Sequence, residues 1–200
     1  MIPDVRGQPI INIHRVEDDE GRYIFSGSCG SVEMIVRQPE PEDLHAVKVA
    51  ERRCSKRTIE RFVMMGMPFK KLGDPPTICH YPPFMPGSIG FLFLTMWVGV
   101  EVVGFGRHFY HYGRDLKMYQ TPDDDLVGEC GLCIIDPYQG KGLGSLYALI
   151  NKLVCKEMGA KWLVGTTYTK GGFMKIRHRD GFDIVEVLPD GKQCRVRGKL

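Results

Sequence analysis

The sequence predicts an α/β (α+β) fold with a mixed central sheet flanked by helices. Two adjacent apolar segments, residues 91–98 and 100–112, have the composition of neighbouring strands, and residues 143–158 carry apolar side chains at helical spacing. With 200 residues, 43% of them hydrophobic, the chain is long enough for one domain with a sizeable core.

Residues 1–31 are predicted to be a strand-like N-terminal extension to a main domain of residues 32–200. Within the extension, residues 10–14 and 22–25 resemble strands because they are rich in β-branched and aromatic side chains. The small and polar residues 26–31 predict a flexible turn or linker before the main domain begins.

The main domain is expected to begin with a strand at residues 33–37. The prolines and acidic residues of 39–43 then favour a helix start, and apolar residues continue from there at helical spacing. A second short helix is predicted from Ser55, as N-cap, to Gly66. Residues 67–90 are rich in proline and glycine and predict a long ordered loop, a feature that often marks function.

The rest of the chain alternates strands and helices. After the two strands at 91–98 and 100–112, a third is expected at about 126–135, followed by a helix that Gly159 caps at its C-terminus. Residues 162–168 predict a strand, a short helix leads to Gly181, and a hairpin ends the chain.

Charge, hydrophobic pattern and cysteine content argue against a secreted, membrane-spanning or disulfide-rich protein. The net charge of +3 is too small to predict nucleic-acid binding by itself, and no segment resembles a signal peptide or a membrane span. Seven cysteines without framework spacing predict reduced thiols in a cytoplasmic protein. Cys130 and Cys133 on one strand, like His108 and His111 on another, would point to opposite faces, so no metal site is predicted.

The glycine-rich segment from Gln139 to Gly144 is the most informative motif. It lies between a predicted strand and a predicted helix, where unpaired backbone N–H groups and the helix dipole favour an anion such as a pyrophosphate. The segment lacks the Lys-Ser/Thr pair of a Walker loop, and its glycines do not match the dinucleotide-binding spacing.

The Q-x-x-G-x-G pattern after a strand ending in Ile-Asp-Pro resembles the acetyl-CoA loop of the Gcn5-related N-acetyltransferases, the GNAT superfamily. The order of predicted elements from residue 32 to 196 is also similar to that fold. The resemblance implies acetyl-CoA as co-substrate, with pantetheine on the backbone of Cys133, Ile134 and Ile135. It assigns the phosphates to the loop and helix start, formed by Gln139, Gly140, Lys141, Gly142, Leu143, Gly144 and Ser145.

The resemblance also suggests catalytic residues. Glu129 matches the family's catalytic glutamate and is the candidate general base, with a solvated or ion-paired strand residue as the alternative. The family's usual acidic tyrosine and its asparagine are replaced by Arg177 and Lys170. Arginine cannot deliver a proton at neutral pH, so Arg177 would act by charge, or pair with Asp180 on the helix surface. Tyr168 or His178 would then be the acid, or solvent would protonate the thiolate. Lys170 and Arg177 could equally hold the phosphates of CoA.

The leading hypothesis is an N-acetyltransferase that acts on a primary amine of a small molecule or protein. One alternative is a GNAT-fold enzyme that modifies nucleobases or nucleic acid, which the basic residues around 52–61 would favour. A second is a non-catalytic acyl-CoA-binding module. No membrane partner is expected, and a homodimer is left open.

Overall fold

The computed structural model describes residues 2–3, 9–17, 23–58 and 88–200. It confirms the predicted α/β class with a mixed sheet. The chain divides into two compact units. Of the described residues, those before 59 belong to the first unit together with 92–107 and 131–147, and the second unit comprises residues 88–91, 108–130 and 148–200.

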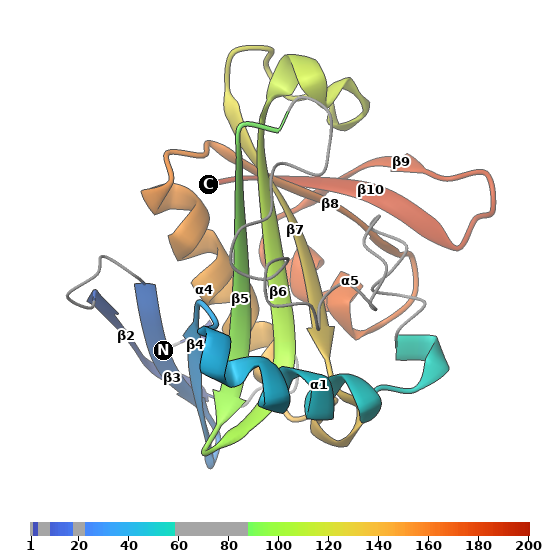
Figure 1. Ribbon diagram of the computed structural model, residues 1–200. Coiled ribbons are helices and arrows are strands. Elements are labelled where there is room, and N and C mark those ends of the chain that lie inside the picture. The colour runs from blue at the N-terminus through green and yellow to red at the C-terminus, as the bar shows by residue number, and fades with distance from the viewer. Residues whose placement is uncertain (1, 4–8, 18–22, 59–87) are drawn as a thin grey trace. The chain divides into compact units, whose positions relative to one another are not determined.

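The N-terminal strands of the first unit form a series of antiparallel pairs (Figure 1). These strands are β1 (Ile2–Pro3), β2 (Pro9–Glu17), β3 (Tyr23–Cys29) and β4 (Val32–Arg37). β4 also pairs in antiparallel fashion with β5 (Gly90–Val98). The predicted strand at 33–37 is therefore confirmed as β4, which lies between β3 and β5.

The linker predicted at residues 26–31 is wrong over most of its length. Ser26 to Cys29 continue β3 and pair in register with β4, and only Gly30 and Ser31 turn the chain. Small polar residues are compatible with a strand here because the ladder bonds come from the backbone. Phe25 is 0% exposed, so β3 contributes to the core of the first unit.

The helical segment after β4 begins as predicted. A 3₁₀ turn at Pro41–Asp43 leads into α1 (Leu44–Arg52), which buries Val47 and Ala50. Arg37 holds the turn through two hydrogen bonds to Asp43 of 2.6 and 2.8 Å. The backbone N–H of Thr58 donates to Ser55 Oγ, which confirms Ser55 as an N-cap. The remainder of the predicted second helix and most of the 67–90 loop lie outside the described residues.

Four elements have residues in both units. They are β5, β6 (Glu101–Tyr112), β7 (Leu126–Ile134) and α4 (Leu143–Glu157). In the first unit the strand order is β1-β2-β3-β4-β5-β6-β7. A Cβ at Gly106 of β6 would lie 1.5 Å from the hydroxyl oxygen of Tyr147 on α4, so the glycine makes room for that buried ring.

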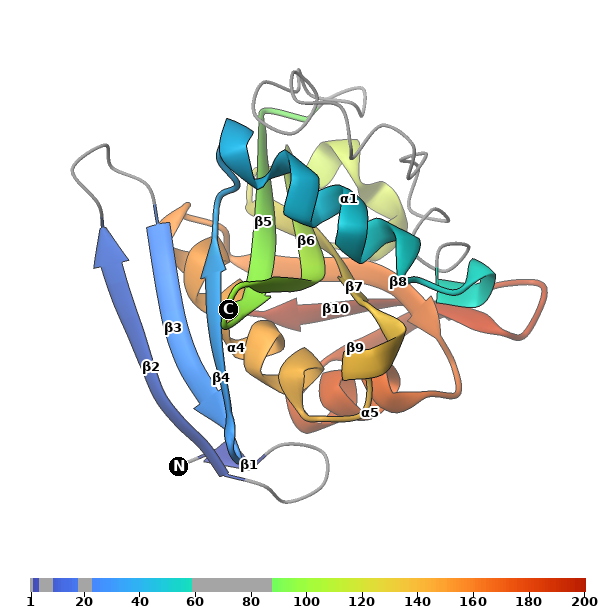
Figure 2. The same cartoon turned by 60° about the horizontal axis from the view of Figure 1, so that its bottom comes forward.

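The second unit has the strand order β6-β7-β8-β10-β9. β8 (Trp162–Tyr168) is parallel to β7, whereas β10 (Gln193–Lys199) is antiparallel to both β8 and β9 (Asp183–Val187). These strands and α5 (Gly172–Arg179) can be followed in Figure 2. Short 3₁₀ helices at Gly113–Asp115 and Lys117–Tyr119 precede β7. No helix in the part of the chain described above is long and apolar enough to cross a bilayer.

Candidate functional site

The glycine-rich segment forms a turn that ends at the start of α4. Gly140 and Gly142 have φ values of 75° and 86°, in the left-handed region that favours glycine. Ser145 N–H donates to the Gly142 carbonyl at 2.9 Å. The N–H groups of Leu143 and Gly144 lie before this bond, within the first turn of a helix, where no intrahelical acceptor exists. The local structure therefore has the form of a helix N-terminal anion site.

A carboxylate fixes the residues that precede this turn. Asp136 accepts hydrogen bonds from the Ser55 N–H at 2.7 Å, the Ser55 hydroxyl at 2.9 Å and the Thr58 hydroxyl at 3.1 Å. Burial alone would raise the pKa of Asp136, but these hydrogen bonds outweigh it and hold the pKa below its usual value. Sequence analysis did not predict this network because Ser55 and Asp136 are 81 positions apart.

The side chain of Gln139 braces the turn from within. Its amide nitrogen donates to the Ile134 carbonyl at 2.9 Å and to the Thr58 hydroxyl at 3.0 Å. The Lys141 ammonium lies 4.6 Å from the centre of the Tyr138 ring. These contacts attach the loop to the end of β7 and to the helical segment that begins at Ser55.

Arg53, one of the basic residues around 52–61 that would favour a nucleic-acid substrate, forms an ion pair within the first unit. Arg53 lies 3.2 Å from the carboxylate of Glu101, which also accepts a 2.6 Å hydrogen bond from the Tyr138 hydroxyl. Hydrogen bonds from Tyr138 and then Arg53 hold the pKa of Glu101 below its usual value. This pairing favours a structural role for Arg53 beside the loop.

The backbone of β7 alternates between its two edges in this region. Ile135 N–H donates to the Val103 carbonyl of β6 at 3.0 Å. Successive strand residues direct their backbone groups to opposite edges, so Cys133 shares the β6 edge with Ile135, and Ile134 and Leu132 face the other edge. Leu132 was not among the residues expected to bind pantetheine. The resemblance to the family indicated the end of this strand but not which residues face its open edge.

Glu129 lies in the second unit, opposite Val164 of β8 in the parallel ladder. Its carboxylate accepts a 3.0 Å hydrogen bond from the Tyr119 hydroxyl, which also lies 3.3 Å from the Thr166 hydroxyl. Burial, and then the charge of Glu129, raise the pKa of Tyr119 above its usual value, so this phenol stays a hydrogen-bond donor. The sequence gives no signal for the contact between Tyr119 and Thr166. One lies in a 3₁₀ helix and the other in a strand 47 positions later.

Arg177 is buried on α5, with 1% of its surface exposed. Its guanidinium carbon lies 4.6 Å from the Phe173 ring centre and 4.3 Å from that of Phe182. The expected place of Arg177 on the helix surface is therefore wrong, although the charge of Asp180 still acts on its guanidinium. Asp180 accepts its 2.9 Å hydrogen bond from Arg179. Burial lowers the pKa of Arg177, and its Nε and Nη1 have no hydrogen-bond partner among the described residues.

The two candidate acids lie on different elements. Tyr168 is half-buried at the end of β8, opposite Gln193 of β10, and His178 is exposed on α5. Lys170 is exposed between these two elements. The role of general acid stays a prediction for both Tyr168 and His178.

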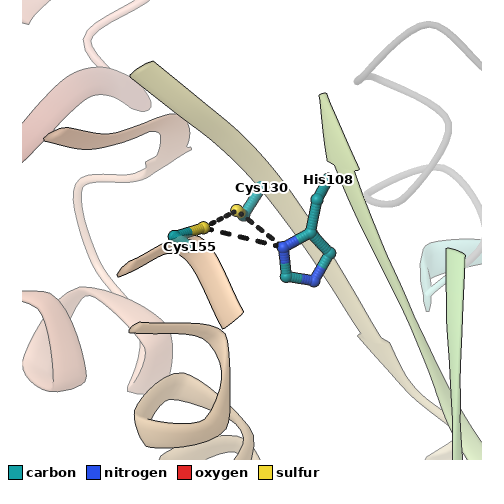
Figure 3. A group of neighbouring side chains, drawn as sticks. All are labelled: His108, Cys130 and Cys155. Carbon is teal, nitrogen blue, oxygen red and sulfur yellow. Dashed lines mark hydrogen bonds between the residues drawn. The ribbon is translucent and has the colours of Figure 1, made fainter. Parts of the chain in front are cut away.

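A buried group of sulfur and nitrogen donors lies in the second unit. His108 of β6, Cys130 of β7 and Cys155 of α4 direct their side chains toward one another (Figure 3). The hydrogen bond from Cys130, assisted by His108, outweighs the opposing effect of burial and holds the pKa of the Cys155 thiol well below its usual range, whereas burial raises the pKa of Cys130. Sequence analysis paired His108 with His111 and Cys130 with Cys133, because it compared positions only within single strands.

Solved structures show which fold this arrangement represents. The GNAT domain of S. lividans PAT is 17% identical, with a TM-score of 0.64 over 94% of this chain and 97% of that chain. RimJ of Mycobacterium smegmatis, solved with CoA-disulfide, is 14% identical, with a TM-score of 0.62 over 96% of this chain and 88% of that one.

PaiA N-acetyltransferase from Thermoplasma acidophilum, solved in complex with coenzyme A, is 16% identical, with a TM-score of 0.54 over 84% of this chain and 99% of that one. No family model and no curated protein sequence matches the chain. The chain therefore has the fold of the GNAT acetyltransferases, as the sequence analysis predicted, at low sequence identity.

Proposed function

We propose that this protein is an acetyl-CoA-dependent N-acetyltransferase that transfers the acetyl group directly to a primary amine. The observation that carries the proposal is the glycine turn at the start of α4, with left-handed Gly140 and Gly142 and N–H groups that precede the first intrahelical bond. On a GNAT fold, this turn suits the pyrophosphate of coenzyme A.

The cofactor would be held mainly by backbone groups. The N–H groups between Gly140 and Gly144 bind the phosphates, and the Asp136 and Gln139 contacts keep the turn in shape when it is empty. Pantetheine pairs with the edge of β7 that faces away from β6, through Ile134 and Leu132. The Gln139 amide already occupies one lone pair of the Ile134 carbonyl, so the Ile134 N–H is the main donor.

The chemistry follows from the reactants. The amine nitrogen attacks the thioester carbonyl carbon, Glu129 accepts the amine's proton, and the carbon–sulfur bond breaks to give the amide and a CoA thiolate. That thiolate takes a proton from Tyr168, His178 or solvent. The hydrogen bond from Tyr119 orients the Glu129 carboxylate for this role.

Two glycine variants test cofactor binding. Gly142→Ala and Gly181→Ala each place a methyl group on a residue with positive φ, 86° and 75° respectively. Both should lose about 1 kcal/mol of stability through the same backbone strain. Only Gly142→Ala should weaken acetyl-CoA binding in calorimetric titration, by about tenfold or more. Equal affinity in the two folded variants would remove the turn from the cofactor site.

A turnover assay tests whether the protein is an enzyme. CoA release should be measured across small amines, peptides with free amino groups, and amine-bearing nucleobases, with intact-protein mass spectrometry to detect self-acylation. Acetyl-CoA binding without release on any acceptor would favour the alternative of a non-catalytic acyl-CoA-binding module. The buried arginine at the position of the family's tyrosine is the observation that favours this second candidate.

A further inference from the structure

The side chains of His108, Cys130 and Cys155 form a compact triangle of metal-binding atoms. His108 Nδ1 lies 3.4 Å from Cys130 Sγ and 3.7 Å from Cys155 Sγ, and the two sulfur atoms are 3.7 Å apart (Figure 3). The three residues come from β6, β7 and α4, and all belong to the second unit.

These separations match a tetrahedral metal centre. With zinc–sulfur bonds near 2.3 Å and zinc–nitrogen bonds near 2.0–2.1 Å, tetrahedral angles separate two thiolates by about 3.8 Å and a thiolate from an imidazole nitrogen by about 3.6 Å. The triangle therefore needs little rearrangement to hold a zinc ion.

The donor set and its burial narrow the choice of ion. Two thiolates and an imidazole are soft to borderline ligands that favour zinc over magnesium, calcium or manganese. His108 and Cys155 are 0% exposed and Cys130 is 3% exposed, which is typical of a closed structural site and not of a catalytic one with an open position.

We propose that His108, Cys130 and Cys155 bind a structural zinc ion, with the side-chain oxygen of Asn151 as the fourth ligand. Asn151 lies one helical turn before Cys155 on α4, and its Oδ1 is 3.9 Å from Cys155 Sγ. It is also buried, with 2% of its surface exposed.

Charge balance is compatible with zinc in this interior. Each cysteine loses its thiol proton to solvent on binding, so one Zn²⁺ and two thiolates form a neutral centre with neutral histidine and asparagine. The buried guanidinium of Arg177 interacts electrostatically with both sulfur atoms. In the zinc-bound state the metal balances the charge of the two thiolates. The Arg177 guanidinium then contributes the single net positive charge of this buried group.

Zinc would join three elements that share no local sequence. Such a link stabilises the folded chain without a part in acyl transfer, because the unfolded chain does not hold the four ligands together. The proposal is independent of the acetyltransferase activity.

The test begins with the unmodified full-length protein. The protein is reduced, incubated with zinc chloride, desalted and analysed by elemental mass spectrometry, which should find about one zinc per chain. Cobalt in place of zinc should give thiolate-to-metal charge-transfer bands and the intense visible bands of a tetrahedral centre. The melting temperature should be compared between protein with free zinc at a hundred times its dissociation constant and protein treated with a chelator. The chelator-treated protein should melt about 5–10 °C lower.

Variants locate the ion. Cys155→Ser and His108→Gln should bind zinc at least about tenfold more weakly. Cys194→Ser is the matched control, because Cys194 is also 0% exposed in the second unit but contacts the sulfur of Met174 instead. Zinc-free wild-type protein after reconstitution would overturn the proposal, as would uptake of Cu(I) but not zinc, or zinc binding that is equal in all variants.

Discussion

At the scale of single residues, Glu129 and Arg177 are charged groups in very different surroundings. The carboxylate of Glu129 accepts a hydrogen bond from Tyr119, which helps a charged base keep one orientation. The guanidinium of Arg177 is enclosed by Phe173 and Phe182 and makes no hydrogen bond through Nε or Nη1 to any described residue. Each arrangement leads to a prediction that can be tested with one substitution.

Replacement of Glu129 by glutamine should remove the proposed general base. At neutral pH the rate should fall by about 10²–10⁴, while acetyl-CoA affinity changes little. The defect should shrink at high pH, where the amine is already deprotonated. Steady-state kinetics against pH measure this, with Glu186→Gln on the exposed face of β9 as control. Wild-type rates across the whole range would make Glu129 a structural residue.

Replacement of Arg177 by methionine should separate charge from packing. Methionine fills a similar volume between the two phenylalanine rings and removes a buried charge with incomplete hydrogen bonding, so the unfolding free energy should stay within about 1 kcal/mol of wild type or rise. If the guanidinium also stabilises a developing thiolate by charge, turnover falls without a loss of stability. Urea denaturation and kinetics give both readouts, and a loss of several kcal/mol would show that Arg177 has strong partners.

At the scale of elements, the Asp136 carboxylate holds the segment after α1 to the turn before α4. Asp136 accepts hydrogen bonds from both hydroxyl side chains at the start of that helical segment, Ser55 and Thr58. A hydrogen-bonded network of this kind limits the number of conformations that the empty glycine turn can adopt. Removal of the network should therefore affect both stability and cofactor affinity.

The pH dependence of Asp136→Asn follows from the lowered pKa of this carboxyl group. A carboxyl group whose pKa is lower in the folded than in the unfolded state stabilises the fold above the unfolded pKa of about 3.9, and this contribution disappears as pH falls through the folded pKa. The variant should therefore be less stable than wild type at pH 7, by about 1 kcal/mol because solvent screens the group. The difference should vanish in strong acid.

Denaturant unfolding at pH 7 and at low pH measures this difference. Asp123→Asn, at an exposed position in the loop before β7, is the matched control and should change stability little at either pH. A constant difference between Asp136→Asn and wild type at all pH values would mean that the charge of Asp136 is not what stabilises the turn.

At the scale of the whole molecule, the N-terminal strands bear on how the chain divides. The prediction of an extension at residues 1–31 and a domain at 32–200 rested on composition. The structure places β3 next to β4, with six residue pairs between Ile24–Cys29 and Val32–Arg37. Phe25 and Cys29 of β3 are 0% and 1% exposed, so the first unit includes part of the predicted extension in its core.

Deletion of residues 1–31 should therefore destabilise the protein. Loss of the buried Phe25 side chain alone removes about 2 kcal/mol of apolar burial, and the edge of β4 becomes open to pairing between chains. The truncated chain should melt at a lower temperature in circular dichroism and scatter more light on heating. A truncated chain with the melting temperature of the full-length protein would confirm the predicted boundary.

The sequence predicted those features that depend on neighbouring residues. Strands β5 to β8 and helix α4 follow from local periodicity, and the glycine turn follows from a short motif beside them. The missed features join distant positions, such as Ser55 with Asp136, Tyr119 with Thr166, and Cys130 with Cys155. One sequence contains no signal for such pairs. The error at Ser26–Cys29 arose because small polar residues suggest a linker even where backbone pairing makes a strand.

The close fit between Gly106 and Tyr147 limits the order in which this protein can change during evolution. A Cβ at position 106 would meet not only the phenolic oxygen but also the ring carbon that carries it, at 2.2 Å. Loss of the hydroxyl alone, as in Tyr147→Phe, would not make room for alanine at position 106. A lineage would first have to shorten residue 147, for example to leucine, and tolerate the cavity left beside Gly106 until another residue fills it. Glycine at 106 is therefore retained for as long as residue 147, which lies 41 positions away on α4, carries an aromatic ring.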